Sequence, residues 1–268
     1  MPNLDLQDIA QYVEQNIGSF HAKRLEKLQK LNFKEVLKRK NPYLFKAKNI
    51  LTAQDLVKNL LDAYLQSQEE TLFGDFLEGV AIFVCQKVFG GVKSRVLEGI
   101  DLEFLKNGKY YIIEIKSGPN WGNSSQIKKM KDNFKSAKKI LLKQSPNLHV
   151  LAINGCCYGI ESQPKKDGYQ KICGQEFWQL ISDTSTLYTD IIEPLGYQAK
   201  EKNEEFLRAY ARVVNQFTLQ FAQDFCDDGV IDWQKIVEFN SKQKLNTAKV
   251  AKPTQPKATV KKNPTNHQ

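Results

Sequence analysis

Two acids and a lysine lie close together in the segment GIDLEFLKNGKYYIIEIKSG, residues 99–118. Asn107-Gly108, between two runs of strand-forming residues, predicts a hairpin with a two-residue type I′ turn. In that register Asp101 lies directly opposite Glu114, and alternation along the strand places Lys116 on the same face. Carboxylates so close repel each other unless they bind a cation, and Mg²⁺ prefers such oxygen ligands. Since Lys116 can then reach a phosphate oxygen, the set suits hydrolysis of a phosphodiester.

The alternative interpretation of this alternation is a solvent-exposed sheet face. Charged residues commonly alternate with apolar ones on the wet side of an antiparallel sheet. The strand YYIIEIK, residues 110–116, is however nearly continuous in apolar residues, which favours burial on both faces. Buried charges need a partner, so burial favours the metal site.

The segment before the hairpin is predicted to be helical. Leucine spacing predicts helices over about residues 5–70, interrupted at Asn41-Pro42 and resumed after Thr52, a suitable N-cap. A further helix is expected to start near Thr71 and to carry Glu78. Glu78 is then either an exposed helix residue or a third carboxylate at the metal site, depending on how this helix packs beside the hairpin.

A mixed α/β core is predicted around the hairpin. After the loop SGPNWGNSSQ, a helix from about Ser124 places apolar residues on one face and lysines on the other. LHVLAING, residues 148–155, is typical of a buried strand. Hairpin, helix and strand in this order predict a mixed central sheet flanked by helices. We expect a helical N-terminal region over 1–70 that grips DNA or forms a dimer contact, the α/β core with C-terminal helices over 71–240, and a basic disordered tail over 241–268.

The composition predicts one sizeable globular core. The chain has 268 residues, of which 41% are hydrophobic and 26% are charged. It has neither a basic start followed by an apolar run nor a stretch of about eighteen apolar residues, so we expect a cytoplasmic protein. Five scattered cysteines without a C-x-x-C pair predict reduced interior residues and no structural zinc.

Clusters of basic residues are the candidate DNA contacts. The formal net charge is +9, but seven lysines and no acid lie in residues 241–268, so the rest of the chain carries only +2. Local clusters matter more, because phosphate attraction acts over about 8 Å at physiological salt. One set lies on the helix from Ser124 and one in the loop after the buried strand: Lys128, Lys131 and Lys135, and then Lys165, Lys166, Tyr169 and Lys171. Each set is either a DNA contact or a solvated surface, and the loop set has side chains suited to groove contacts.

Two resemblances extend these inferences. Gly-Ile-Asp, the hairpin and Glu-Ile-Lys resemble the metal motif of the PD-(D/E)XK nuclease superfamily, with Ile100 where that pattern has proline. Longer blocks are similar to a type II restriction endonuclease family that includes enzymes cutting interrupted GG-N-CC-type sites: TLFGDFLEG, CCYG, CGQEFWQLIS, LYTDIIEPLG, KEKNEEFLRAY and DGVIDWQKIVEFNS. The resemblance implies a restriction-endonuclease-like fold and a cytoplasmic, Mg²⁺-dependent homodimer. Such an enzyme cuts double-stranded DNA at a short, roughly palindromic site, and a cognate DNA methyltransferase protects the host.

The same resemblance implies roles for individual residues. Asp101 and Glu114 match the metal-ligating acids, and Lys116 matches the catalytic lysine. The backbone carbonyl of Ile115 is implied as an extra ligand, and Glu78 resembles the helix glutamate that assists in part of the superfamily. The resemblance does not identify the residues that recognise DNA bases, because such residues lie on loops that vary between relatives. Two other functions stay open: a repair or recombination nuclease of the same superfamily that recognises DNA structure, and a DNA-binding protein without catalysis.

Overall fold

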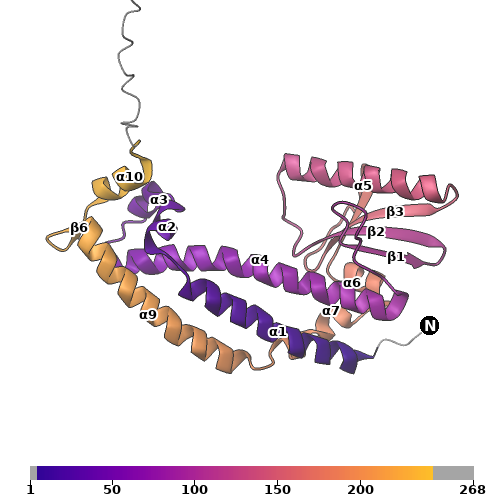
Figure 1. Ribbon diagram of the computed structural model, residues 1–268, viewed down its shortest axis with the longest axis horizontal. Coiled ribbons are helices and arrows are strands. Elements are labelled where there is room, and N and C mark those ends of the chain that lie inside the picture. The colour runs from indigo at the N-terminus through magenta and orange to yellow at the C-terminus, as the bar shows by residue number, and fades with distance from the viewer. Residues whose placement is uncertain (1–4, 244–268) are drawn as a thin grey trace, which may run out of the picture.

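The computed structural model describes residues 5–243 of the chain. Its long helices α1 (Leu6–Gln29), α4 (Ala53–Phe89) and α9 (Ala199–Phe225) lie side by side and give the molecule an elongated shape (Figure 1). The sheet packs at one end of these helices, and a group of short elements packs at the other. The predicted tail over 241–268 lies almost wholly outside the described residues.

Within residues 5–243 the main sheet has five strands, in the order β1-β2-β3-β5-β4. They are β1 (Leu102–Lys106), β2 (Lys109–Lys116), β3 (His149–Cys156), β4 (Lys165–Lys166) and β5 (Tyr169–Cys173). β2, β3 and β5 run parallel to one another, whereas β1 and β4 are antiparallel to their neighbours. The predicted mixed sheet flanked by helices is therefore confirmed.

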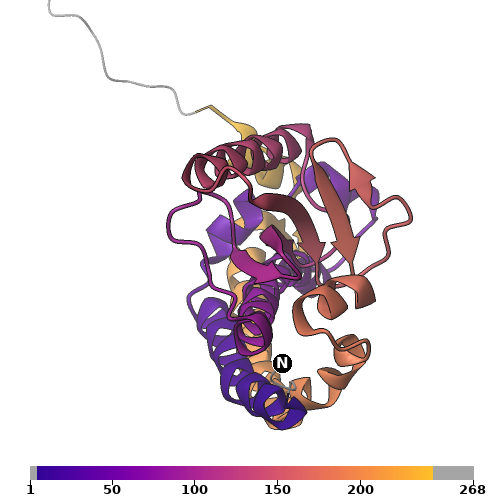
Figure 2. The same ribbon diagram turned by 90° about the vertical axis from the view of Figure 1, so that its right-hand side faces the viewer.

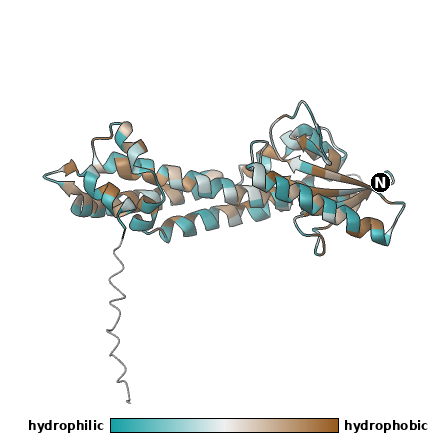
Figure 3. Ribbon diagram, turned by 90° about the horizontal axis from the view of Figure 1, so that it is seen from above, coloured by the Kyte–Doolittle hydropathy of each residue, from teal (hydrophilic) through white to brown (hydrophobic). Residues whose placement is uncertain are grey.

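Helices cover both faces of this sheet (Figure 2). α5 (Ser124–Gln144) packs on the face that carries Ile112, and α4 with α6 (Gln175–Ser182) packs on the face that carries Ile113. Both isoleucines are 0% exposed, which confirms the predicted burial of β2 on two faces. Figure 3 looks down on α5 and shows mostly hydrophilic residues along its outer side, as the lysine spacing predicts.

The hairpin that carries the acids has the predicted turn and register. Asn107 and Gly108 have φ values of 50° and 72°, the positive values that a type I′ turn requires. Lys106 pairs with Lys109, and regular pairing continues to Leu102 opposite Ile113. The turn therefore determines which residues of the two strands face each other.

The end of the molecule away from the sheet has its own apolar cluster, formed by α4, α9 and several short elements. These elements are α2 (Phe33–Lys38), α3 (Pro42–Ala47), β6 (Cys226–Asp227), β7 (Val230–Ile231) and α10 (Trp233–Ser241). Phe33 of α2 packs against Phe217 and Phe221 of α9. Two short helices, α7 (Leu187–Asp190) and α8 (Ile192–Leu195), connect the sheet end back to α9.

One predicted helix boundary is wrong. No helix starts near Thr71, because α4 runs without interruption from Ala53 to Phe89. The N-cap predicted at Thr52 is confirmed, since its side chain accepts a hydrogen bond from the N–H of Asp55. The polar residues before Thr71 include Gln and Glu, which favour a helix, and Leu65 and Leu72 on either side of them are both buried. The expected boundary between residues 70 and 71 therefore falls inside one helix.

Candidate active site

A hollow of about 710 Å³ opens between the hairpin and α5. Asp101, Glu114 and Lys116 all line it. Asp101 precedes β1 and the other two end β2, so the hairpin brings the three residues to one edge of the sheet. The structure thus gathers the acid, acid-x-lysine set that the sequence predicts.

Asp101 is held by the backbone of β2. Its N–H donates to the carbonyl of Ile113 at 2.9 Å, and its Oδ2 accepts from the N–H of Ile115 at 2.8 Å. Asp101 and Leu102 therefore both face Ile113, which is the pattern of a β-bulge. The prediction that Asp101 directly opposes Glu114 in a regular ladder is wrong, because the Asp101 side chain takes the hydrogen bond that backbone pairing would use.

The environment of Asp101 disfavours its charge. Burial raises the pKa of Asp101 to about 6, and the nearby carboxylate of Glu78 adds to this increase. The hydrogen bond from Ile115 works in the opposite direction, as does the charge of Lys116. A cation that binds in the hollow would therefore stabilise the charged form of Asp101.

Glu114 offers one oxygen to such a cation. Its Oε1 lies 2.8 Å from Nζ of Lys116, and the Glu114 side chain is only 13% exposed. Its Oε2 is buried and has no hydrogen-bond partner. An unpartnered carboxylate oxygen beside a second carboxylate fits a divalent cation, because burying it alone is unfavourable.

Glu78 does not join these two acids in a shared ligand group. In residues 5–243, no three His, Cys, Asp or Glu side chains lie together so as to hold one metal ion. The carboxylate of Glu78 instead bonds to Nζ of Lys93 at 2.7 Å. Two carboxylates still suit Mg²⁺, which keeps several waters and binds through one or two acids. The carbonyl of Ile115 as a further ligand stays a prediction.

Two lysines near the site were not predicted from the sequence. Lys93 approaches from the loop before β1, where a single lysine among glycine and serine gives no pattern. Lys129 lines the hollow from α5 and lies 3.9 Å from Glu98. The helical spacing of α5 could have shown that Lys129 and Met130 lie one turn from Gln126, but not which side of the lysine-rich face borders the hollow.

The predicted DNA contacts on α5 lie partly in solvent. Lys128 and Lys135 are exposed, whereas Lys131 bonds to Asp167 at 3.1 Å. That ion pair connects α5 to the turn between β4 and β5. Lys128 and Lys135 thus stay available to a ligand, and Lys131 has a structural partner.

The predicted contacts near β5 are mostly engaged within the protein. Lys165 is exposed, but Lys166 and Lys171 approach the carboxylate of Glu161 at 3.3 and 3.5 Å. Lys171 also donates to the carbonyl of Pro119 at 2.8 Å. Tyr169 packs against Phe134 of α5. The structure therefore gives Lys171 and Tyr169 roles in holding loops together, while their part in reading DNA stays a prediction.

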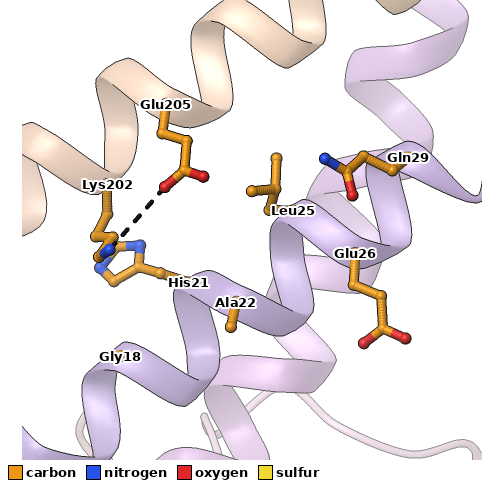
Figure 4. Close-up of a pocket in the computed structure, with 8 residues that line it drawn as sticks. All are labelled: Gly18, His21, Ala22, Leu25, Glu26, Gln29, Lys202 and Glu205. Carbon is orange, nitrogen blue, oxygen red and sulfur yellow. Dashed lines mark ion pairs between the residues drawn. The ribbon is translucent and has the colours of Figure 1, made fainter.

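A second hollow, of about 270 Å³, lies between α1 and α9 (Figure 4). His21 of α1 faces Lys202 of α9 there, and Lys202 pairs with Glu205 at 4.0 Å. The lining of this hollow includes no acid, acid-x-lysine set. The hollow beside the hairpin is therefore the better candidate for hydrolytic chemistry.

None of the helices within residues 5–243 is both long enough and apolar enough to cross a membrane.

Comparison with known proteins identifies the family. No curated protein matches the chain significantly. A family model described as "Type II restriction endonuclease EcoO109I" matches residues 7–203, which include the hairpin, α5 and every residue that lines the site hollow. The match spans 197 of the 268 residues and confirms the resemblance seen in the sequence. The chain therefore belongs to the EcoO109I family of type II restriction endonucleases.

Proposed function

We propose that this restriction endonuclease uses Mg²⁺ to cut both strands of DNA at a short, roughly palindromic site. The observation that carries the proposal is the buried, unpartnered Oε2 of Glu114 in the same hollow as Asp101 and Lys116. Burying a carboxylate oxygen without a hydrogen-bond donor is unfavourable, and a cation bound beside it would offset this.

Each site residue has a distinct part in the proposed reaction. Asp101 and Glu114 hold Mg²⁺, and the Ile115 N–H keeps the Asp101 carboxylate oriented for this. Bound there, Mg²⁺ supplies the positive charge that activates water and neutralises phosphoryl oxygens. Lys116 donates hydrogen bonds from Nζ, which orients the attacking water and stabilises negative charge as it develops.

The arrangement of elements supports assignment to the PD-(D/E)XK superfamily. The acids lie on a hairpin, a helix follows, and the next strand returns parallel to β2. Asp101 and the Glu-Ile-Lys segment then meet at one sheet edge, as that superfamily's motif implies. We accordingly propose the PD-(D/E)XK fold for the core.

The proposal extends to partners and location. Two antiparallel strands at a palindrome are most simply cut by two copies related by the DNA dyad, so we propose a homodimer. We further propose that the enzyme works in the cytoplasm with a cognate DNA methyltransferase that protects the host.

Removal of the lysine amine tests the proposed role of Lys116. We expect Lys116→Ala to lower the cleavage rate by about 100-fold or more, because a charge-stabilising donor is lost. DNA affinity in EDTA should stay close to that of the wild type. A matched control is Lys46→Ala, which also removes a lysine from above a tryptophan ring but at the opposite end of the molecule. Normal cleavage by Lys116→Ala would exclude this role.

A further inference from the structure

Two side chains, one that lines the hollow and one buried beneath it, have no part in the reaction as proposed. Nζ of Lys116 lies 4.8 Å from the ring centre of Trp121. The indole Nε1 of Trp121 donates to Oδ1 of Asn154 at 3.0 Å, and Nδ2 of Asn154 donates to the backbone carbonyl of Glu114 at 3.3 Å. A continuous chain of contacts therefore runs from Lys116 through Trp121 and Asn154 to Glu114.

Asn154 is an unusual residue for its position. It is 1% exposed, in the middle of β3 and in register with Glu114. A buried amide destabilises the fold unless its donors and acceptor are bonded, whereas an apolar side chain would fill the same space without that requirement. Its two hydrogen bonds go to the backbone of Glu114 and to Trp121, which contacts Lys116. The buried amide therefore fixes the position of both residues.

The loop that carries Trp121 is fixed at several points. The N–H of Tyr158 donates to the carbonyl of Ser117 at 3.1 Å, and Lys171 holds the carbonyl of Pro119. Directly after Trp121, Gly122 has a φ of 75°, a conformation that favours glycine. Asn123 then caps α5. The indole is therefore presented from a rigid turn.

The face of the Trp121 indole gives the Lys116 ammonium a contact that does not depend on the carboxylates proposed to bind the metal. Nζ of Lys116 contacts Oε1 of Glu114, whose other oxygen is the one proposed to bind the metal. A divalent cation on this carboxylate withdraws negative charge from Oε1 and weakens its attraction for Lys116, and the long flexible lysine stem then needs a second contact to keep the amine in place. An aromatic face attracts an ammonium but does not bind Mg²⁺, so it holds Lys116 without competing for the ion.

We propose that Trp121 and Asn154 are positioning residues for the nuclease reaction. The ring of Trp121 holds the ammonium of Lys116 over the site, and Asn154 fixes both the indole and the Glu114 backbone. The inference rests on the roles proposed above for Lys116 and Glu114. It adds that the lysine reaches its full effect on the cleavage rate only when this aromatic support is present.

Single-turnover cleavage at saturating DNA and Mg²⁺ tests the inference. We expect Trp121→Leu to slow cleavage about 10-fold, because a partly desolvated cation–π contact is lost. Trp121→Phe keeps an aromatic face and should recover most of the rate. DNA affinity should change by less than about twofold, since neither residue is proposed to bind DNA. Trp233→Leu is the control, because it removes a tryptophan ring near Lys46 far from the site.

Nuclear magnetic resonance provides a readout that does not depend on cleavage. In protein labelled with ¹³C at the lysine ε carbon, the ε-methylene signal of Lys116 should be displaced by the indole ring current. Lys116→Met assigns the signal by removing it, and Trp121→Leu should move it to the position of solvent-exposed lysines. An undisplaced Lys116 signal in the wild type overturns the inference, whether or not Trp121→Leu folds.

The outcomes separate this inference from the proposed function. If the wild type cuts DNA and Trp121→Leu cuts at the same rate, the positioning role is wrong while the nuclease assignment stands. If the wild type fails to cut any DNA with Mg²⁺ present, the proposed function fails, and a displaced Lys116 signal would still show the contact.

Discussion

Burial of the Asp101 carboxylate disfavours its charged form, and the proposed metal site would account for an acid in this place. The carboxylate is desolvated and lies near the charge of Glu78, so its pKa is raised to about 6. A residue selected for stability alone would not carry a charge here. Strongly shifted pKa values of this kind cluster at functional sites.

Asp101→Asn should stabilise the protein in EDTA at pH 8. Because the folded-state pKa lies above that of the unfolded chain, Asp101 supports folding fully below pH about 4, and this support is lost as the pH rises through about 6. A pKa raised by about two corresponds to at most about 3 kcal/mol in the free energy of unfolding. Because the Asp101 carboxylate is partly exposed, we expect an effect of about 1–2 kcal/mol. Urea unfolding at pH 8 and at pH 4 measures this difference in stability. Asp101→Asn should have a higher free energy of unfolding than the wild type at pH 8 but not at pH 4. An equal effect at both pH values contradicts the account.

At the scale of elements, β3 and α6 pack without a gap. A Cβ added at Gly155 of β3 would lie 2.3 Å from the ring of Phe177, which is 0% exposed. Gly155 also lies in register with Ile115, between the two site residues of β2. The absence of a side chain at Gly155 allows Phe177 of α6 to pack closely against the sheet beneath the site.

Gly155→Ala should lower the free energy of unfolding by about 1–3 kcal/mol, because a buried ring must move to admit the methyl group. Gly74→Ala on α4 is the matched control. Its added Cβ meets Ser117 Cβ at an ordinary 3.5 Å, and alanine favours a helix, so it should stabilise by about 0.5–1 kcal/mol. Thermal or denaturant unfolding measures the stability of both variants. Equal destabilisation by Gly155→Ala and Gly74→Ala would contradict this prediction.

The position of α5 predicts which of its lysines meets DNA phosphate. Lys129 lines the hollow, whereas Lys139 is exposed further along the same helix and does not. Lys129→Gln should weaken DNA binding several-fold and reduce the slope of log affinity against log salt by about one, because one phosphate contact is lost. Lys139→Gln should leave the slope unchanged. Filter or fluorescence binding over a range of salt measures both, and identical slopes would contradict the placement of Lys129.

At the scale of the whole molecule, the long helices separate the end that carries the candidate active site from a second apolar cluster. α4 takes part in both, since it packs beneath the sheet and also reaches the group formed by α2, α3 and α10 (Figure 1). The N-terminal helical region, predicted to grip DNA or to form a dimer contact, and the long α9 are the candidate surfaces for the dimer. The proposed dimer can use these surfaces and leave the hollow at the sheet edge open.

Much of this fold is predictable from local sequence signals. Asn107-Gly108 determined the hairpin register, and the apolar spacing after Ser124 located α5. The continuity of α4 was not predicted, because the apolar spacing is interrupted by the polar residues before Thr71, although the Gln and Glu among them favour a helix. Local pattern decides such elements when it is strong, and packing decides them when it is weak.

The site was predictable only where its residues lie in one segment. Asp101, Glu114 and Lys116 share a hairpin, so geometry alone brings them together. Lys93, Trp121 and Asn154 come from different loops and strands, and their contacts follow from the parallel pairing of β2 with β3 and from the rigid turn before α5. No spacing in the sequence shows that juxtaposition.

The most direct test of the central claim is a digest of unmethylated phage DNA. The purified wild type is incubated with Mg²⁺ or with EDTA, beside Glu114→Gln and the control Glu176→Gln, which changes an exposed acid on α6. Discrete fragments should form with the wild type and the control in Mg²⁺ alone, and Glu114→Gln should give none. Intact DNA under every condition despite measurable binding, or cleavage that persists in EDTA or in Glu114→Gln, would contradict the account.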